Sequence, residues 1–183
     1  MRKEDEIMRL MKVLKIADKH TIGRIMSQRG HWAEGTSATN NAYKILCSLA
    51  DLNQLEKGKG YFRIPGCKSE YQQHARLVTL VIIEILLRYP DSLIHREHSI
   101  PEVGLRPDIL ALLIRKGQEG RCLVTEIVNH ELDQSLEKKR NAWESWSGAT
   151  EYLSQLFGYR IPFFDFIALE EETSWLEDMP FTL

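Results

Sequence analysis

Two short apolar runs that carry carboxylates constrain the fold of this chain more than any other feature. Asp108 leads into the run 109–114, and Glu126 lies inside the run 122–128. Both runs are rich in branched residues and are bounded by Gly or Pro, which is typical of β-strands. The connection at 116–120 is short enough for a hairpin. We therefore expect an antiparallel pair of strands that brings Asp108 close to Glu126.

Neighbouring carboxylates repel each other unless a cation lies between them. For phosphate chemistry the usual cation is Mg²⁺, and Mn²⁺ is the natural substitute. Asp108 and Glu126 are therefore a candidate metal site. The alternative is a fold that keeps both carboxylates only as hydrogen-bonding groups.

The composition is that of a globular protein, with 43% hydrophobic and 27% charged residues in a chain of 183, enough for one domain or two small ones. The longest apolar stretch, 77–87, contains Glu84 and is too short to span a membrane. The N-terminus is charged and lacks an apolar signal core. The isolated cysteines Cys47, Cys67 and Cys122 form neither a zinc pattern nor a disulfide framework. We expect a cytoplasmic protein without a membrane partner.

The charge is distributed unevenly along the chain. Residues 1–68 contain 13 lysines and arginines against 7 aspartates and glutamates, a net charge of +6. Residues 69–183 contain 11 against 19, a net charge of −8. This asymmetry predicts that only the first third meets a polyanion unaided. Chance segregation in a small protein is the alternative.

Helical periodicity runs through the first third. Apolar residues recur at helical spacing over 7–14 and again over 22–26. Thr36 or Ser37 can then cap a third helix. The apolar stripe of that helix consists of Ala38, Ala42, Ile45, Leu46 and Leu49.

The other side of the third helix is polar, and a basic segment follows it. Short donors and acceptors with one cation suit base edges and phosphates. These side chains are Ser37, Asn40, Asn41 and Lys44. The run 55–64 contains Lys57 and Lys59 and reads as a tight hairpin, with glycines at 58 and 60 in its turn.

Three helices followed by a basic hairpin resemble the winged helix-turn-helix family over residues 4–65. The resemblance implies a domain at 1–66 in which helix 37–51 enters the major groove of double-stranded DNA. Lys57 and Lys59 would then touch the DNA backbone. It also implies a homodimer, because most such proteins pair half-sites. A winged helix used for protein contacts is the alternative, and we interpret Tyr43 as a packing residue.

For the remainder, residues 67–183, the sequence pattern predicts a helix at 69–88, three strands, a helix from about Gln134 and a last strand at 161–169. This order, with Pro107-Asp108 and Glu126, resembles the PD-(D/E)xK nuclease superfamily. The resemblance implies an α/β domain with a mixed sheet flanked by helices.

The same resemblance implies a ligand set for Mg²⁺ or Mn²⁺. Asp108 and Glu126 would bind the metal, and the backbone carbonyl of Ile127 would add a ligand. Glu84 would join them from the preceding helix. Alternatively, Glu84 pairs with Arg88, four residues further on.

The superfamily normally has a lysine two residues after the glutamate, where this chain has Val128. Some members carry that lysine on the following helix, and Lys139 is the candidate here. It lies at helical spacing with Leu136, Trp143 and Trp146, so it shares the face expected to pack on the sheet. Lys139 would orient the attacking water. Alternatively, it pairs with one of the carboxylates and replaces the metal with its own charge.

A closer resemblance is to the replication-relaxation family of plasmid and mobile-element proteins. It lies in Thr-Glu-Ile-Val-Asn at 125–129 and Lys-Lys-Arg-Asn-Ala-Trp-Glu-Ser-Trp at 138–146. It implies work on plasmid, phage or transposon DNA, in replication or its regulation.

Three hypotheses follow from these resemblances. The first is a DNA-binding protein with an inactive, nuclease-derived second domain. The second is an active Mg²⁺-dependent endonuclease, with Asp108, Glu126 and Lys139 as catalytic residues. The third is a winged-helix transcription regulator, although the sequence indicates no small-molecule pocket.

Two smaller features concern isolated polar residues near predicted strands. His95 and His98 flank a predicted strand around 93–98 and are candidates for catalytic bases or metal ligands. The alternative is that both are partly exposed strand residues. Asp165 interrupts an apolar strand, and we expect it to bond a neighbouring backbone group or Arg160, or to orient Lys139.

Overall fold

The computed structural model describes residues 2–67, 73–114, 120–128 and 133–170 of the chain. The chain divides into two compact units, residues 1–92 and residues 93–183. Over the described ranges the protein has six helices and two sheets, one of them a mixed sheet of four strands. The expected mixed α/β class is therefore confirmed.

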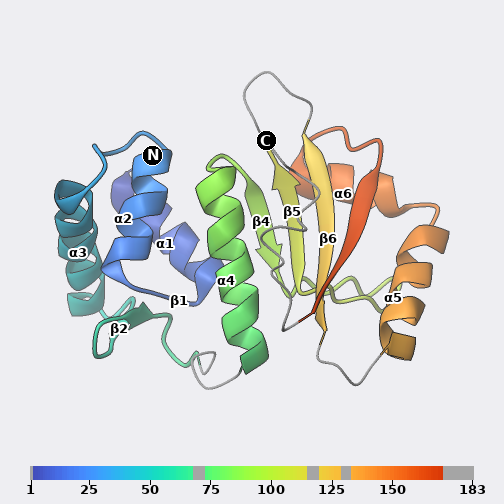
Figure 1. Cartoon of the computed structure of the whole chain (residues 1–183), viewed down its shortest axis with the longest axis horizontal. Helices are drawn as coiled ribbons and strands as arrows, with labels where there is room; N and C mark the ends of the chain where they lie inside the picture. The colour runs from blue at the N-terminus through green and yellow to red at the C-terminus, as the bar shows by residue number, and fades with distance from the viewer. Residues whose placement is uncertain (1, 68–72, 115–119, 129–132, 171–183) are drawn as a thin grey trace. The chain divides into compact units, whose positions relative to one another are not determined.

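The first unit consists of helices with a small sheet (Figure 1). Its elements are α1 (Lys3–Leu14), β1 (Ile16–Ala17), α2 (Lys19–Gln28), α3 (Thr36–Asp51), β2 (Glu56–Lys57), β3 (Phe62–Arg63) and α4 (Gln73–Arg88). The sheet is antiparallel, in the order β1-β3-β2. The hairpin of β2 and β3 agrees with the expected one, whereas the two-residue strand β1 was not anticipated.

Apolar faces of the helices form the core of the first unit. The predicted stripe of α3 is buried except at Ile45, which is half-buried. Helix α3 contacts α1 and α2, whose periodic apolar residues are buried as well, among them Met11, Leu14, Ile22 and Ile25. The predicted cap of α3 is wrong, because Gly35 occupies that position and no side chain caps the helix.

The second unit is built on the four-stranded sheet. Its elements are β4 (Leu93–Arg96), β5 (Ile109–Leu113), β6 (Arg121–Val128), α5 (Asp133–Ser145), α6 (Ala149–Phe157) and β7 (Phe164–Glu170). The strand order is β4-β5-β6-β7, antiparallel except for the parallel pair β6 and β7. A parallel pair needs a long crossover, which α5 and α6 provide. One helix was expected there, and two are present.

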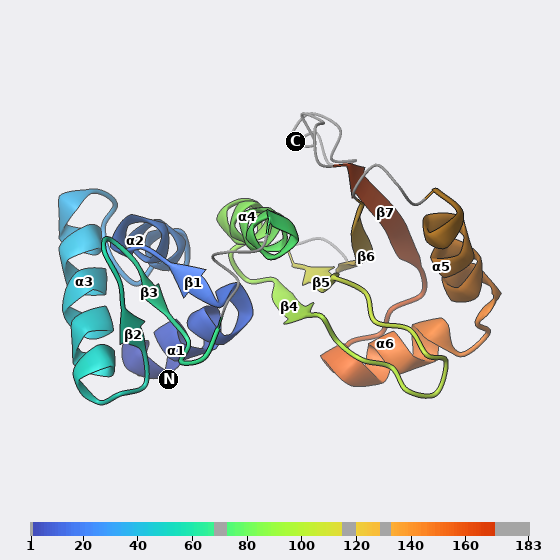
Figure 2. The same ribbon diagram turned by 90° about the horizontal axis from the view of Figure 1, so that it is seen from below.

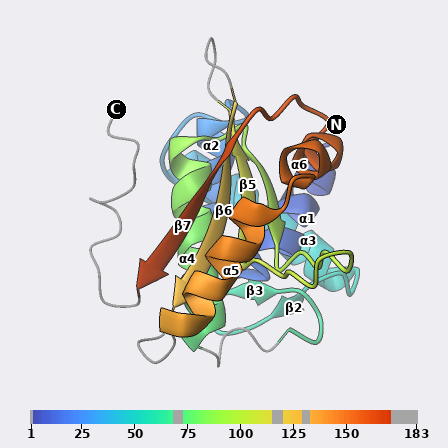
Figure 3. The ribbon, with the colours of Figure 1, turned by 90° about the vertical axis from the view of Figure 1, so that its right-hand side faces the viewer.

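Helices α5 and α6 lie on the same side of this sheet (Figures 2 and 3). Trp143 of α5 and Leu153 of α6 are buried in one cluster with Leu110, Cys122 and Val124 of the sheet. Burial, with the charge of Asp165 as a smaller contribution, raises the pKa of the Cys122 thiol to about 12. Cys122 is therefore an inert core residue.

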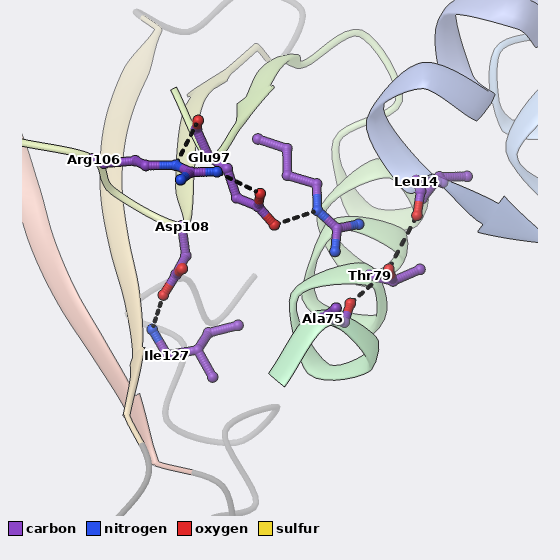
Figure 4. Close-up of polar contacts among 8 residues, drawn as sticks. Leu14, Ala75, Thr79, Glu97, Arg106, Asp108 and Ile127 are labelled. Carbon is purple, nitrogen blue, oxygen red and sulfur yellow. Dashed lines mark hydrogen bonds and ion pairs between the residues drawn. The ribbon is translucent and has the colours of Figure 1, made fainter. Parts of the chain in front are cut away.

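Helix α4 belongs to the first unit and is joined to α1 by a buried polar contact. The Thr79 hydroxyl lies 3.0 Å from the carbonyl oxygen of Leu14, at the end of α1, and 2.9 Å from that of Ala75 (Figure 4). The domain boundary expected at residues 66 and 67 consequently falls inside the first compact unit.

A buried carboxylate also joins α1 to the end of α2. Glu6 accepts a hydrogen bond from Arg29 Nη1 at 2.8 Å, and its other oxygen lies 2.7 Å from His31 Nε2. Arg29 Nε donates in addition to the carbonyl of Pro90, at 2.7 Å. These contacts satisfy an acidic group that has almost no access to water.

Candidate carboxylate site and nucleic-acid interface

Asp108 lies at the point where the pairing of β5 with β6 ends. The last pair in register is Ile109 with Thr125, so Asp108 and Glu126 occupy the next position on their strands. The strand pairing therefore brings residues 108 and 126 next to each other, as expected. Pro107, which has no N–H group, precedes Asp108 and ends the ladder.

The Asp108 carboxylate continues the pairing that its backbone no longer makes. Its Oδ2 accepts a hydrogen bond from the backbone N–H of Ile127 at 2.8 Å (Figure 4). On the other side, the Asp108 carbonyl accepts from the N–H of Glu97 at 2.9 Å. Asp108 therefore links the start of β5 to β6 on one side and to the residue after β4 on the other. This structural role explains a carboxylate at this position.

Glu126 is buried within β6, with 3% of its side chain exposed. Its neighbours two and four residues back, Val124 and Cys122, are in the core cluster that α5 covers. Because side chains alternate along a strand, Glu126 faces α5 as well. Lys139 Nζ of α5 donates to Glu126 Oε2 at 2.6 Å, and 43% of the lysine side chain is exposed.

The helical face predicted for Lys139 explains this contact. Trp143 is completely buried one turn further along α5, which anchors the helix on the sheet. Lys139 is consequently held above the strand, whereas its neighbours Lys138 and Arg140 are exposed. Of the alternatives expected for Lys139, the structure has the ion pair with Glu126.

A divalent cation would require several oxygen ligands directed at one point. Here Glu126 Oε2 is bonded to Lys139, and Asp108 Oδ2 is bonded to Ile127, whose carbonyl was the third expected ligand. Within the described ranges no group of three or more His, Cys, Asp or Glu residues is arranged to hold a metal. The contact of Glu126 with Lys139 is that of an ion-paired site.

Two other candidates have partners of their own. Glu84 lies in the first unit, and its carboxylate accepts from Arg88 Nε at 2.7 Å, which is the alternative expected for it. Asp165 of β7 accepts from Arg121 Nε of β6 at 2.6 Å. The expected partners of Asp165 were a backbone group, Arg160 or Lys139, and Arg121 was not among them, because the parallel pairing of β6 with β7 could not be read from the sequence.

His95 and His98 form an aromatic cluster with α6. Their ring centroids are 5.2 Å apart, His95 contacts Phe157 edge-on at 5.4 Å, and His98 Nε2 is hydrogen bonded to the Tyr152 hydroxyl at 2.8 Å. Glu97 between them has φ of 49°, a left-handed conformation that is uncommon for a residue with a side chain. Tyr152 as a partner was not predictable, because the contact spans 54 residues.

Desolvation is the main cause of the altered titration in this cluster. Burial, with a smaller contribution from His98, lowers the pKa of His95 below its usual value of 6.5. Burial also raises the pKa of Tyr152, to which the charge of Glu102 adds. Both pKa shifts favour the neutral form of the side chain, His95 and Tyr152 alike.

The polar face of α3 lies open to solvent in the first unit. Ser37, Asn40 and Lys44 are exposed, and Asn41 is half-buried. On the hairpin, Lys57 and Lys59 are exposed. The hairpin contacts α3 directly, because Lys57 Nζ donates to the Tyr43 hydroxyl at 3.3 Å and lies 3.7 Å from Cys47 Sγ. The residues expected to contact DNA are thus gathered on α3 and the adjoining hairpin.

No family model, curated protein or solved structure was found to match this chain. The helices of the described segments all lack the length and apolar character needed to cross a bilayer.

The ion pair of Lys139 with Glu126 should contribute to the stability of the second unit. Lys139→Met removes the ammonium partner of a buried carboxylate. We expect a loss of about 1–3 kcal/mol in the free energy of unfolding, below the cost of breaking a fully buried pair because Lys139 is partly exposed. Urea unfolding followed by tryptophan fluorescence measures it. Lys138→Met, on the same turn, is the matched control and should change stability by less than about 0.5 kcal/mol.

Adding Glu126→Gln to Lys139→Met removes the buried charge and should recover part of the lost stability. A double-mutant cycle then isolates the coupling between the two side chains. Equal effects of Lys139→Met and Lys138→Met would show that the pair contributes nothing.

The buried position of His95 should make stability depend on pH. Its pKa is lower in the folded protein than in the unfolded chain, so the unfolded chain binds the proton more readily. Stability is therefore fully present above pH 6.5 and is lost as the pH falls from there toward the folded pKa. The slope is at most about 1.4 kcal/mol per pH unit.

Urea unfolding between pH 5.5 and 7.5, roughly the range in which histidine titrates, tests this. His95→Gln should flatten the dependence, and His20→Gln, at an exposed position on α2, should leave it unchanged. The same slope in wild type and His95→Gln would assign the effect to other groups.

Proposed function

We propose that this chain is a double-stranded DNA-binding protein whose first unit is a winged helix. The order of helix, short strand, two helices and hairpin, closed by a three-stranded antiparallel sheet, supports this assignment. The observation that carries the proposal is the exposed polar face of α3, against which the hairpin places Lys57. Side chains that can bond base edges and cations that can bond phosphates then lie on one surface.

The charge of the chain supports the same assignment. The net charge of +6 on residues 1–68 stands against −8 on the remainder. Cations supply the sequence-independent part of DNA affinity by replacing condensed counterions. Residues 1–68, which lie within the first unit, are therefore the part of the chain suited to make the first contact with duplex DNA.

For the second unit we propose a PD-(D/E)xK-like domain, derived from a nuclease and used for assembly or additional DNA contact. The mixed sheet, the crossover helices α5 and α6 and the parallel last strand support it, as does the placement of Asp108 beside Glu126. Lys139 neutralises Glu126 at 2.6 Å, which supports loss of metal chemistry. Such a protein would act, as a cytoplasmic homodimer, in replication of a mobile element or its regulation.

An active Mg²⁺- or Mn²⁺-dependent endonuclease is the second candidate. The observation that favours it is the presence of an aspartate, a glutamate and a lysine around one end of the β5–β6 pair. In that case Asp108 and Glu126 would hold the metal. Lys139 would have to exchange its bond to Glu126 for one to the attacking water.

DNA binding should depend on the exposed lysines of α3 and the hairpin. Changing Lys44 or Lys59 to Ala should weaken binding to a duplex, because each removes one phosphate contact. It should also reduce the slope of log affinity against log salt by about 0.9. Fluorescence anisotropy over a salt titration measures both quantities. Lys12→Ala, at an exposed lysine of α1, is the control, and a slope unchanged in all variants would refute the proposed interface.

Cleavage is tested with supercoiled plasmid in Mg²⁺, in Mn²⁺ and in EDTA, beside a gel shift with the same preparation. We expect a gel shift and intact plasmid in every lane. Asp108→Asn is the informative variant, because its amide oxygen can still accept the Ile127 hydrogen bond while its negative charge is gone. Metal-dependent nicking by wild type that disappears in this variant would establish the endonuclease instead.

A further inference from the structure

An exposed tyrosine on α3 brings together two lysines from other elements. Tyr43 is 39% exposed, and its ring centroid lies 5.2 Å from Lys19 Nζ of α2 and 5.3 Å from Lys57 Nζ of β2. Lys57 Nζ also donates to the Tyr43 hydroxyl at 3.3 Å. Sequence patterns did not suggest Lys19, and they assigned Tyr43 to packing.

The core of the first unit holds these three side chains in place. Lys19 is the first residue of α2, where Asp18 caps the helix by accepting from the N–H of Thr21 at 2.7 Å. The Tyr43 ring packs edge-on against Phe62 of β3, at 6.2 Å between centroids. Phe62 is buried and pairs with Lys57 in the hairpin. The cluster is therefore built before any ligand arrives.

Among the described residues, no carboxylate is paired with either ammonium group. Glu56 precedes Lys57 on β2, but it is paired with Arg63 at 2.6 Å. Within the part of the chain that the structure describes, neither Lys19 nor Lys57 forms an ion pair with a carboxylate. The hydrogen bond to Tyr43 is the main cause that raises the pKa of Lys57, so this lysine stays charged. Two like charges at one exposed ring produce a local positive potential that favours an anion.

We propose that Lys19, Tyr43 and Lys57 form a binding site for one phosphodiester group of the DNA backbone. Both ammonium groups would donate to its non-bridging oxygens. The Tyr43 hydroxyl accepts from Lys57, which leaves its hydrogen free to donate to the same phosphate. The proposal rests on the proposed DNA-binding function and adds Lys19 and Tyr43 to it.

The position of the site on α3 favours duplex DNA over other polyanions. Asn40 lies three residues before Tyr43 and Lys44 directly follows it, and both are exposed and polar. A phosphate held at Tyr43 would therefore fix the height of α3 relative to the groove its polar residues enter. A membrane surface would instead favour apolar side chains beside the cations, which these positions do not offer.

The test is duplex binding by fluorescence anisotropy across a salt titration. Lys19→Met should weaken binding about tenfold at low salt, the effect of one charge-assisted hydrogen bond, and reduce the salt slope by about 0.9. Tyr43→Phe keeps the ring but loses the donor, so affinity should fall with little change of slope. Lys19→Arg keeps the charge and should restore the slope.

Lys3→Met is the matched control, because Lys3 also lies over an aromatic ring, 5.5 Å from the centroid of Trp32. It should bind as wild type does. Circular dichroism and thermal unfolding of each variant establish that the fold is retained. If Lys19→Met reduces the salt slope and Lys19→Arg has the wild-type slope, the reduction cannot come from misfolding.

The outcomes separate this inference from the function on which it rests. No duplex binding by wild type would overturn both. Binding that weakens with Lys44→Ala but is unchanged by Lys19→Met and Tyr43→Phe would overturn only the phosphate site. Binding to phosphatidylserine vesicles that depends on Lys19, in a protein that ignores duplex DNA, would assign the cluster to a membrane surface and overturn it too.

Discussion

Burial of the Glu126 carboxylate is the constraint on which the second unit depends. All six residues 122–127 of β6 are buried, so a charged side chain among them needs a partner of opposite charge. Lys139 can supply that partner only if α5 crosses the same face of the sheet. Trp143, one turn further on, anchors the helix there. An apolar contact and an ion pair four residues apart thus determine which face of α5 meets the strand.

The first unit uses the same principle at a different place. Glu6 is buried where α1 meets the end of α2, and its carboxylate contacts Arg29 and His31. In each unit a buried carboxylate joins a segment of the chain to a distant one, because its partner is 13 or more residues away in sequence. Loss of such a contact leaves a buried charge, which is far more costly than the net benefit of the pair.

The sequence was a good guide wherever a local pattern decided the structure. The short apolar runs at 109–114 and 122–128, rich in branched residues and bounded by Gly or Pro, predicted β5 and β6, and the short turn predicted their antiparallel pairing. The helical spacing of Lys139 and Trp143 predicted which residues of α5 face the sheet. The apolar stripe of α3 was predicted by the same argument, with Ile45 less buried than expected.

Features that depend on distant contacts could not be predicted in this way. Strand β1 has only two residues and exists because β3 pairs with it. Gly35 precedes α3 in a backbone conformation with φ of 106°, which favours glycine over the capping side chains that the pattern suggested. The contacts of Lys57 with Tyr43 and of His98 with Tyr152 join residues that no local pattern relates.

Lys139 differs from Lys19 and Lys57 in whether its positive charge is balanced by a carboxylate of the protein. Lys139 is bonded to a buried carboxylate, so its charge is already balanced inside the protein, and it also reduces the negative potential that would attract a divalent cation. Lys19 and Lys57 gather around a tyrosine while the nearby Glu56 is bonded to Arg63. A polyanion would therefore gain more from the first unit than from Lys139. This difference supports the proposal that the protein binds DNA through α3.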